Sequence, residues 1–209
     1  MNHCPIDNSM YTFSSDWIHQ LEGKQHWIYY WHQIHQIRSR IKEGDTVLEI
    51  GVGTKFTSNY LKSKGYKVVT IDIDPEKEPD LLGNIVEVQL PESYDFILAY
   101  EVFEHIPFED FVKVLHNLGP VCRRYLLMSL PRNEKFWFEL SATLPGNRQL
   151  GFRIATLRKK IITRNHHWEV DYSPYTKKRI AETIRKESFK IESVEKVSSL
   201  YFYALEKSD

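Results

Sequence analysis

The stretch VLEIGVGTK, residues 47–55, decides the fold of this 209-residue chain. An apolar run of strand length ends at Ile50, and two glycines, Gly51 and Gly53, follow it. Glycines at such a turn take left-handed backbone conformations and let a ligand approach the main chain closely. Apolar residues then recur at helical spacing over residues 56–64. The stretch therefore predicts a strand, a tight turn and a helix, which is an arrangement that binds ligands.

Two acidic residues accompany this turn. Glu49 precedes the first glycine, and Asp72 lies in a second predicted strand, Lys67–Ile73, which is rich in β-branched residues. Asp72 follows Gly51 by 21 residues, close to the roughly 20 expected for an acid that binds ribose hydroxyls in a doubly wound fold. The spacing thus indicates a ligand that contains a nucleoside.

Phe56 helps to distinguish a dinucleotide cofactor from a nucleoside cofactor that has no pyrophosphate. Dinucleotide-binding turns carry a third glycine three residues after the second, where the helix packs over a pyrophosphate. Phe56 occupies that position, and its ring leaves little room for a pyrophosphate. An acid two residues before Gly51 also suits a ligand with positive charge, such as a sulfonium. An NAD-dependent oxidoreductase is therefore a distant alternative.

Outward from the turn, apolar runs alternate with amphipathic segments. Further strands are expected at 94–100, 125–130, 191–197 and 199–205, and further helices at 25–41, 108–118 and 176–188. Strands that alternate with helices indicate βαβ units, and the close spacing of the last two strands favours an antiparallel hairpin. We expect an α/β fold with a doubly wound, mostly parallel seven-stranded sheet that contains one antiparallel strand. Residues 136–167 mix aromatic and basic side chains and are expected to be partly helical.

Composition narrows the class of protein further. With 42% apolar and 27% charged residues, the chain has the composition of a globular protein of single-domain length. Its two cysteines, Cys4 and Cys122, support neither a disulfide framework nor a thiolate zinc site. His32 and His35, one helical turn apart, have no evident third ligand, so we expect no metal site.

The distribution of charged residues and the lengths of the apolar runs indicate which partners and which location to expect for the protein. Residues 148–190 hold twelve basic and four acidic side chains, although the whole chain balances at 28 of each. This stretch is either a set of solvated helix faces or an electropositive wall that faces an anionic substrate. The first ten residues are polar without a signal-peptide pattern, and no apolar run approaches the roughly 18 residues that cross a bilayer. We therefore expect a cytoplasmic protein without a membrane partner.

Four segments in order carry a family resemblance. They are EIGVG (49–53), the acid Asp72, DLLGNI (80–85) and DFILAYEVFEHIP (95–107). Together they resemble the motifs of class I S-adenosylmethionine-dependent methyltransferases. The ending EHIP is similar to the branch of small-molecule C- and O-methyltransferases that includes those of quinone biosynthesis. The chain departs from the family at Lys55, where many members have a third glycine, and at Asn84, where an aspartate usually meets the adenine.

The resemblance implies a domain layout, a cofactor and a set of binding residues. The layout is a single Rossmann-like methyltransferase domain over residues 1–209, with an N-terminal helical cap (1–43) and an insertion (132–175) that lines the acceptor pocket. The cofactor is S-adenosylmethionine, and the methyl acceptor is a small molecule. An anionic acceptor is one of the alternatives considered. Cofactor binding is expected at Glu49, Gly51, Gly53, Asp72, Ile73, Asn84, Ile85, Tyr100 and Glu101.

The chemistry of the acceptor side is less defined by the sequence. His105 is the candidate general base, and the alternative is a histidine that makes structural hydrogen bonds near a helix start. The segment HHWE (166–169) either lines the acceptor pocket or forms a loop packed by Trp168. Methyl transfer to RNA or another polyanion, and a non-catalytic cofactor-binding protein, are the alternative functions.

Overall fold

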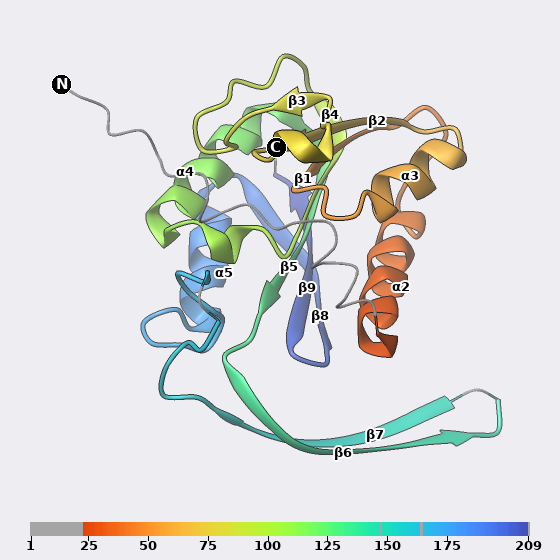
Figure 1. The fold of residues 1–209 in the computed structure, drawn as a ribbon, viewed down its shortest axis with the longest axis vertical. Helices are drawn as coiled ribbons and strands as arrows, with labels where there is room; N and C mark the ends of the chain where they lie inside the picture. Colours follow the sequence, from red (N-terminus) through yellow and green to blue (C-terminus); the bar gives the residue numbers. More distant parts are fainter. Residues whose placement is uncertain (1–22, 147, 164, 209) are drawn as a thin grey trace.

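The protein is described by a computed structural model over residues 23–146, 148–163 and 165–208. Its main strands are β1 (Thr46–Ile50), β2 (Lys67–Asp72), β3 (Leu81–Leu82), β4 (Tyr94–Tyr100), β5 (Cys122–Pro131), β8 (Phe189–Val197) and β9 (Leu200–Lys207). They form one seven-stranded sheet in the order β3-β2-β1-β4-β5-β9-β8 (Figure 1). Strands β1 to β5 pair in parallel, and β9 runs antiparallel to both of its neighbours. The predicted doubly wound sheet with one antiparallel strand is confirmed.

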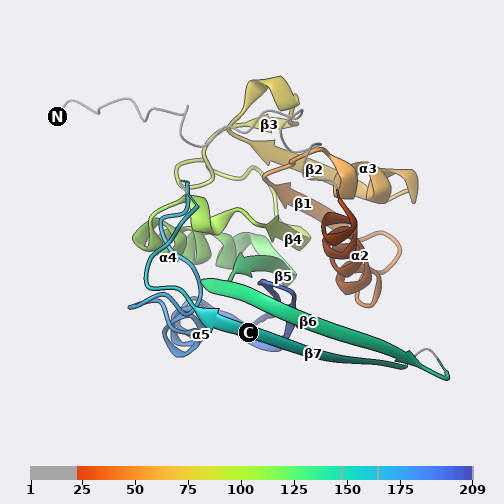
Figure 2. The same cartoon turned by 60° about the horizontal axis from the view of Figure 1, so that its bottom comes forward.

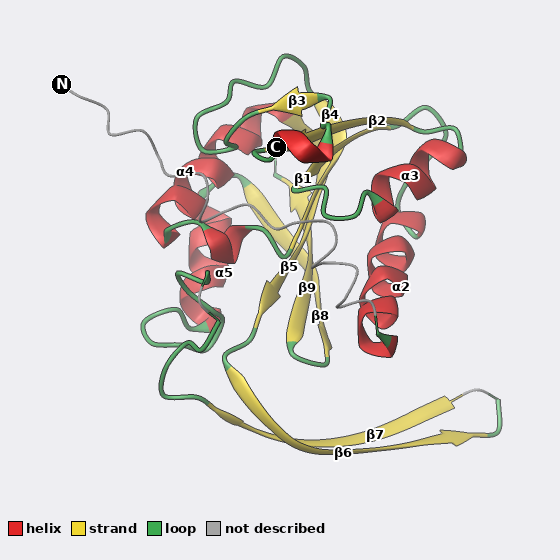
Figure 3. Ribbon diagram, in the orientation of Figure 1, coloured by secondary structure: helices red, strands yellow, loops and turns green. Residues whose placement is uncertain are grey.

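Helices cover both faces of the sheet (Figure 3). They are α2 (Lys24–Arg38), α3 (Phe56–Ser63), α4 (Phe108–Leu118) and α5 (Lys177–Lys186), with the 3₁₀ turns η2 (Pro75–Lys77), η3 (Phe103–His105) and η4 (Gly119–Val121). On one face α2 and α3 bury Ile37 and Leu61 against β1 and β4. On the other face α4 and α5 bury Phe111 and Ile184. Within the described residues, no helix is long and apolar enough to span a membrane.

The helix α5 forms where its sequence predicts one. Thr176 caps it, because the Thr176 hydroxyl accepts a hydrogen bond from the Arg179 main-chain N–H at 3.2 Å. Ile180 and Ile184 are fully buried on its inner face. The hairpin of β8 and β9 that follows is also confirmed, with Val197 paired to Leu200 at its tight end.

The inner face of α2 combines apolar and polar side chains, among them Tyr30, Gln33 and Ile37. Trp27 and Trp31 are 50% and 58% exposed, whereas Tyr30 and Gln33 are buried. The glutamine tolerates burial because its side-chain oxygen accepts a hydrogen bond from the Thr57 hydroxyl at 2.9 Å. The inner face of α2 is therefore partly polar, as suits a helix that covers a ligand site.

The segment after β5 corrects the expectation of a partly helical stretch. It forms an antiparallel two-stranded ribbon, β6 (Glu134–Leu144) and β7 (Arg148–Leu157), which extends beyond the sheet (Figure 2). Apolar residues alternate along both strands, so that Leu140 pairs with Phe152 on one face. This period of two is a strand pattern. A register shift near Phe136 interrupts it and obscures the alternation in the sequence.

Candidate functional site

A cavity of about 870 Å³ lies at the carboxyl ends of β1, β2 and β4, within the range of roughly 300–1,000 Å³ usual for ligand pockets. In a doubly wound sheet this is where the strand order reverses, and ligands bind at that point. The loops after the strands form most of the wall, and α2 contributes the rest. All ten residues that the sequence predicts for the site line this cavity: Glu49, Gly51, Gly53, Asp72, Ile73, Asn84, Ile85, Tyr100, Glu101 and His105.

The glycine turn needs its two glycines for different reasons. Gly51 has a φ of +73°, and a Cβ atom there would lie 2.6 Å from Val102 Cγ2. Gly53 has a φ of +50°, but a Cβ atom there would meet no atom within 4 Å. Gly51 is therefore required by packing and by backbone conformation, whereas Gly53 is required by backbone conformation alone.

Asp72 ties the end of β2 to this turn. One carboxylate oxygen accepts a hydrogen bond from the Val52 N–H at 2.9 Å, and the other accepts one from the Asp74 N–H at 2.9 Å. The Lys77 ammonium lies 3.8 Å from the same carboxylate, and both side chains are 7% exposed. A carboxylate offers about four acceptor sites, so Asp72 can also accept hydrogen bonds from a diol.

Lys77 is a wall residue that sequence reasoning missed. It ends the short turn η2, which Asp74 caps by accepting a hydrogen bond from the Glu76 N–H at 3.0 Å. This turn folds the lysine back onto the end of β2. The pair Asp74-Pro75, an acid before a proline, is the local signal that indicates such a turn, but it does not say which side chain the turn brings into the cavity.

Glu49 and Tyr100 line the same wall from β1 and β4. Burial raises the pKa of Glu49 to about 7, with a smaller opposing effect from hydrogen bonds to Ser58. One oxygen of Glu49 has no hydrogen-bond partner among the described residues. Burial also raises the pKa of Tyr100 well above its usual range, and its hydroxyl donates to the Gln36 side-chain oxygen at 3.2 Å. A cationic group of a ligand would stabilise the charged form of the buried Glu49 carboxyl group.

The loop after β3 places Asn84 and Ile85 at one end of the cavity. The Asn84 side-chain oxygen accepts a hydrogen bond from the Val86 N–H at 3.0 Å. The side-chain amide group of Asn84 is then the part that can donate to a ligand. Ile85 is 9% exposed and Ile73 is half-buried, so both offer apolar surface next to this amide.

Lys55 and Phe56, which follow the glycine turn, have well-defined contacts. Lys55 adopts a φ of +60°, and its ammonium donates to the Glu78 carbonyl at 3.2 Å, away from the cavity wall. Lys55 thus takes a left-handed backbone conformation, which is uncommon for a residue other than glycine. The Phe56 ring stacks on Tyr30 with 4.3 Å between ring centroids, which joins α3 to α2.

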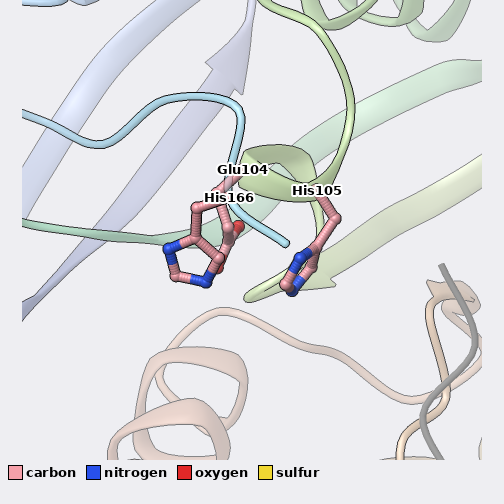
Figure 4. A group of neighbouring side chains, drawn as sticks. All are labelled: Glu104, His105 and His166. Carbon is pink, nitrogen blue, oxygen red and sulfur yellow. The ribbon is translucent and has the colours of Figure 1, made fainter. Parts of the chain in front are cut away.

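Glu104, His105 and His166 meet at the far end of the cavity. Each offers a ligand atom, and these atoms lie within 4.8 Å of one another. Figure 4 shows Glu104 and His105 on η3 and His166 on the loop that faces it. The sequence analysis named Glu104 in the EHIP ending and His166 in the HHWE segment, but it did not predict that either residue lies next to His105. The contact depends on the loop, whose His167 N–H donates to the Glu104 carbonyl at 2.8 Å.

Burial shifts the pKa values of the groups at this end. It raises the pKa of Glu101 to about 7, against a smaller lowering effect of His166. It raises the pKa of Glu104 well above its usual range, and the nearby Glu101 and Glu169 carboxylates add to this increase. It lowers the pKa of His105 to about 4, although the hydrogen bond to the Asn165 carbonyl opposes the shift.

The segment HHWE is packed by Trp168 and also contributes to the cavity wall. Trp168 is fully buried, and its indole N–H donates to the Ile106 carbonyl at 3.1 Å. His166 lines the cavity, and its Nδ1 lies 2.8 Å from a Glu169 oxygen. Within the predicted insertion 132–175, Thr163 also lines the cavity.

The basic segment 148–190 does not form an electropositive wall here, so that expectation is wrong for this cavity. Of its described residues only Thr163 and His166 line the wall, and the lining lysines, Lys77 and Lys113, come from elsewhere. Carboxylates outnumber them: Glu49, Asp72, Glu87, Glu101, Glu104 and Asp110. The segment is divided among β7, the following loop and α5, which covers the sheet on the side of α4.

His32 and His35 belong to no group of three metal-binding side chains within the described residues. The His35 ring stacks on Trp31 at 4.7 Å, and His32 Nδ1 lies 3.4 Å from a Glu195 oxygen. His35 therefore has an ordinary surface contact, whereas His32 is partly buried and its Nδ1 atom has no hydrogen-bond partner among the described residues.

Comparisons with known proteins agree with this geometry. A family model described as a methyltransferase domain matches residues 19–189. Curated protein sequences give no match. The glycopeptide N-methyltransferase MtfA, solved with S-adenosyl-L-homocysteine, is similar with a TM-score of 0.55 and 11% identity over 84% of this chain and 87% of that one.

Two further solved structures share the fold. The 1,6-didemethyltoxoflavin-N1-methyltransferase of Burkholderia thailandensis has a TM-score of 0.54 and 13% identity over 85% of this chain and 76% of that one. An S-adenosylmethionine-dependent methyltransferase of Methanosarcina mazei has a TM-score of 0.56 and 18% identity over 82% of this chain and 96% of that one. At such identities the likeness concerns the fold.

Proposed function

The chain belongs to the methyltransferase domain family and is an S-adenosylmethionine-dependent methyltransferase, and from this premise we propose that its methyl acceptor is a small molecule bound beside His105 and His166. The observation that carries the proposal is one cavity of about 870 Å³ that includes both the glycine turn and these histidines. The EHIP ending supports the same small-molecule branch of the family.

The proposed cofactor contacts follow the wall of the cavity. Asp72 accepts from the ribose hydroxyls, while Ile73 and Ile85 lie against the adenine and Asn84 donates to its edge. The glycine turn lies under the methionyl part, and Glu49 meets its ammonium group. These residues fit the cofactor because Glu49 is buried with an oxygen that lacks a partner among the described residues, and a cation would satisfy it.

The proposed acceptor contacts lie where the chain leaves β4, at its last residue Tyr100 and the following Glu101. S-adenosylmethionine supplies an electrophilic methyl carbon on a sulfonium. The protein contributes mainly by holding the acceptor atom in line with that carbon, which in favourable cases is worth up to roughly 7–11 kcal/mol. His105, buried and lining this part of the cavity, is proposed to help position the acceptor for transfer.

The solved relatives support a small acceptor. Their names state activity on a glycopeptide and on 1,6-didemethyltoxoflavin. Among the described residues only two lysines and no arginine line the cavity, so its wall offers little positive charge to a polyanion.

The test begins with calorimetric titration of S-adenosylmethionine and S-adenosylhomocysteine, for which we expect micromolar binding. The protein is then incubated with a deproteinised cell extract and cofactor that carries a labelled methyl group, and products are separated by size. Label in the fraction below about 1 kDa is the expected result. Label confined to RNA or protein would contradict a small acceptor, and binding without any transfer would favour a non-catalytic protein.

A further inference from the structure

The strongest unassigned feature is the cluster of Glu104, His105 and His166 at the acceptor end of the cavity (Figure 4). Its three ligand atoms lie within 4.8 Å of one another, so small side-chain movements would bring all three to the distance of about 2.0–2.2 Å at which such ligands bind one ion. The side chains come from two segments, η3 and the loop before Trp168, and the Trp168 hydrogen bond to the Ile106 carbonyl fixes these segments together. The cluster is therefore held by the fold and is not a chance surface contact.

The carboxylate of this cluster is buried and incompletely satisfied. Glu104 is 1% exposed, and its Oε2 atom has no hydrogen-bond partner among the described residues. No lysine or arginine forms an ion pair with it in that part of the chain. Leaving a buried carboxylate unsatisfied is costly, so such a group usually holds a proton or a cation.

Hydrogen bonds to the two histidines set their tautomers. His105 Nδ1 lies 2.9 Å from the Asn165 carbonyl oxygen, which can only accept, so Nδ1 carries the hydrogen. His166 Nδ1 lies 2.8 Å from Glu169 Oε1, and the Glu169 side chain is 2% exposed. In the neutral rings the lone pair is then on Nε2 in both cases. A histidine whose Nδ1–H is held by a carbonyl or a carboxylate is the usual arrangement of a metal ligand.

We propose that Glu104, His105 and His166 bind one divalent transition-metal ion, such as Mn²⁺, Fe²⁺ or Zn²⁺, in the wall of the cofactor cavity. Two imidazoles and one carboxylate suit these ions better than Mg²⁺ or Ca²⁺, which prefer oxygen ligands. Glu169 is a positioning residue that orients His166. The metal site was not expected from the sequence, because its ligands are brought together only by the folded loop.

The metal site extends the proposed function, because the ion would bind the methyl acceptor. This role of the ion rests on the proposed function, whereas binding of the ion itself does not. Three protein ligands leave coordination positions for a substrate. An ion there would select acceptors that offer an oxygen or nitrogen ligand next to the methylated atom, and it would lower the pKa of a bound hydroxyl.

The test measures metal binding without S-adenosylmethionine, so that failure of the proposed function does not affect it. Wild-type protein is stripped with a chelator, dialysed and titrated by calorimetry with Mn²⁺ and Zn²⁺, and Co²⁺ is added as a spectroscopic probe. We expect one ion per chain and ligand-field absorption of Co²⁺ typical of nitrogen and oxygen ligands. His166→Ala should weaken binding at least 10-fold, and Glu169→Gln should weaken it by roughly 10- to 100-fold.

His116→Ala is the matched control, because His116 is an exposed histidine of α4 that pairs with a carboxylate, Glu187, outside the cavity. Its binding should equal that of the wild type. Circular dichroism and S-adenosylmethionine affinity report whether each variant is folded. The proposal is overturned if wild-type protein binds none of the three ions at one per chain, or if His166→Ala binds them as tightly as His116→Ala. In that case the cluster would serve the cofactor's sulfonium or the acceptor directly.

Discussion

The carboxylate of Asp72 accepts a hydrogen bond from the Val52 main-chain N–H at 2.9 Å, so the end of β2 holds the glycine turn that follows β1. One side chain thus shapes the turn and faces the cavity at the same time. Two segments that line the cavity are thereby fixed relative to each other.

Replacing this carboxylate should therefore weaken cofactor binding strongly. We expect Asp72→Asn to reduce the S-adenosylmethionine affinity by roughly 10- to 100-fold, since hydrogen bonds to a charged group are worth about 1.5–3 kcal/mol. Calorimetry measures the change. Asp74→Asn is the control: Asp74 is also buried, but its carboxylate caps η2 and does not line the cavity. Equal losses in both variants would contradict the role given to Asp72.

The two glycines of the turn should respond differently to alanine. Gly51→Ala adds a Cβ atom 2.6 Å from Val102 Cγ2 at a positive φ, so we expect a loss of stability and of cofactor binding. Gly53→Ala adds only the left-handed strain of about 1–2 kcal/mol, because no atom lies within 4 Å. Thermal unfolding should show the lower melting temperature for Gly51→Ala. A larger drop for Gly53→Ala would refute this account of the turn.

The raised pKa of Glu49 makes stability depend on pH. The folded protein holds the Glu49 proton up to about pH 7, whereas an unperturbed glutamate loses it near 4.5. Stability should therefore fall as the pH rises from about 4.5 to 7, by up to roughly 3 kcal/mol from this group. Lys62 opposes and Asp72 supports the shift.

Urea unfolding of the protein without ligand at pH 5 and pH 8 measures this effect. In Glu49→Gln the decrease should be smaller than in the wild type. Other buried carboxyls are present in both proteins, so the difference between the two pH dependences isolates Glu49. Parallel curves for the two proteins would show that Glu49 titrates normally.

Leucines of the sheet and of the ribbon should differ in their contribution to stability. Leu127 in β5 is fully buried beneath α2 and α3, and Leu127→Ala should cost about 2–5 kcal/mol. Leu140 in β6 is 61% exposed, and Leu140→Ala should change the free energy of unfolding by no more than about 0.5 kcal/mol. Denaturant titration compares them. A loss above 2 kcal/mol for Leu140→Ala would mean that the ribbon face is covered in solution.

Local patterns explain how much of the fold the sequence could predict. The strand Tyr94–Tyr100 is found over the predicted residues, because a buried parallel strand is a continuous apolar run between polar segments. The glycine turn and Asp72 were equally predictable, since the fold brings short motifs at the ends of adjacent strands to one edge. The ribbon was missed because a register shift near Phe136 interrupts its alternation.

The group of Glu104, His105 and His166 was not predictable for a different reason. Glu104 and His166 are distant in sequence, and the loop that joins them carries no regular pattern. The His167 N–H that donates to the Glu104 carbonyl at 2.8 Å fixes their distance. A single main-chain hydrogen bond of this kind leaves no trace in residue type or spacing. The position of Lys77 could not be predicted for a similar reason, because only the turn η2 brings its side chain next to Asp72.

The ribbon of β6 and β7 pairs only with itself and lies outside the seven-stranded sheet. A lone pair of strands is marginally stable in water, so its amide hydrogens should exchange with deuterium far faster than those of β4 and β5. The same opening makes it the first place where a protease would cut. A nicked chain should then keep its folded core, which means that length and sequence in this arm can diverge among related proteins while the glycine turn and its carboxylate stay fixed.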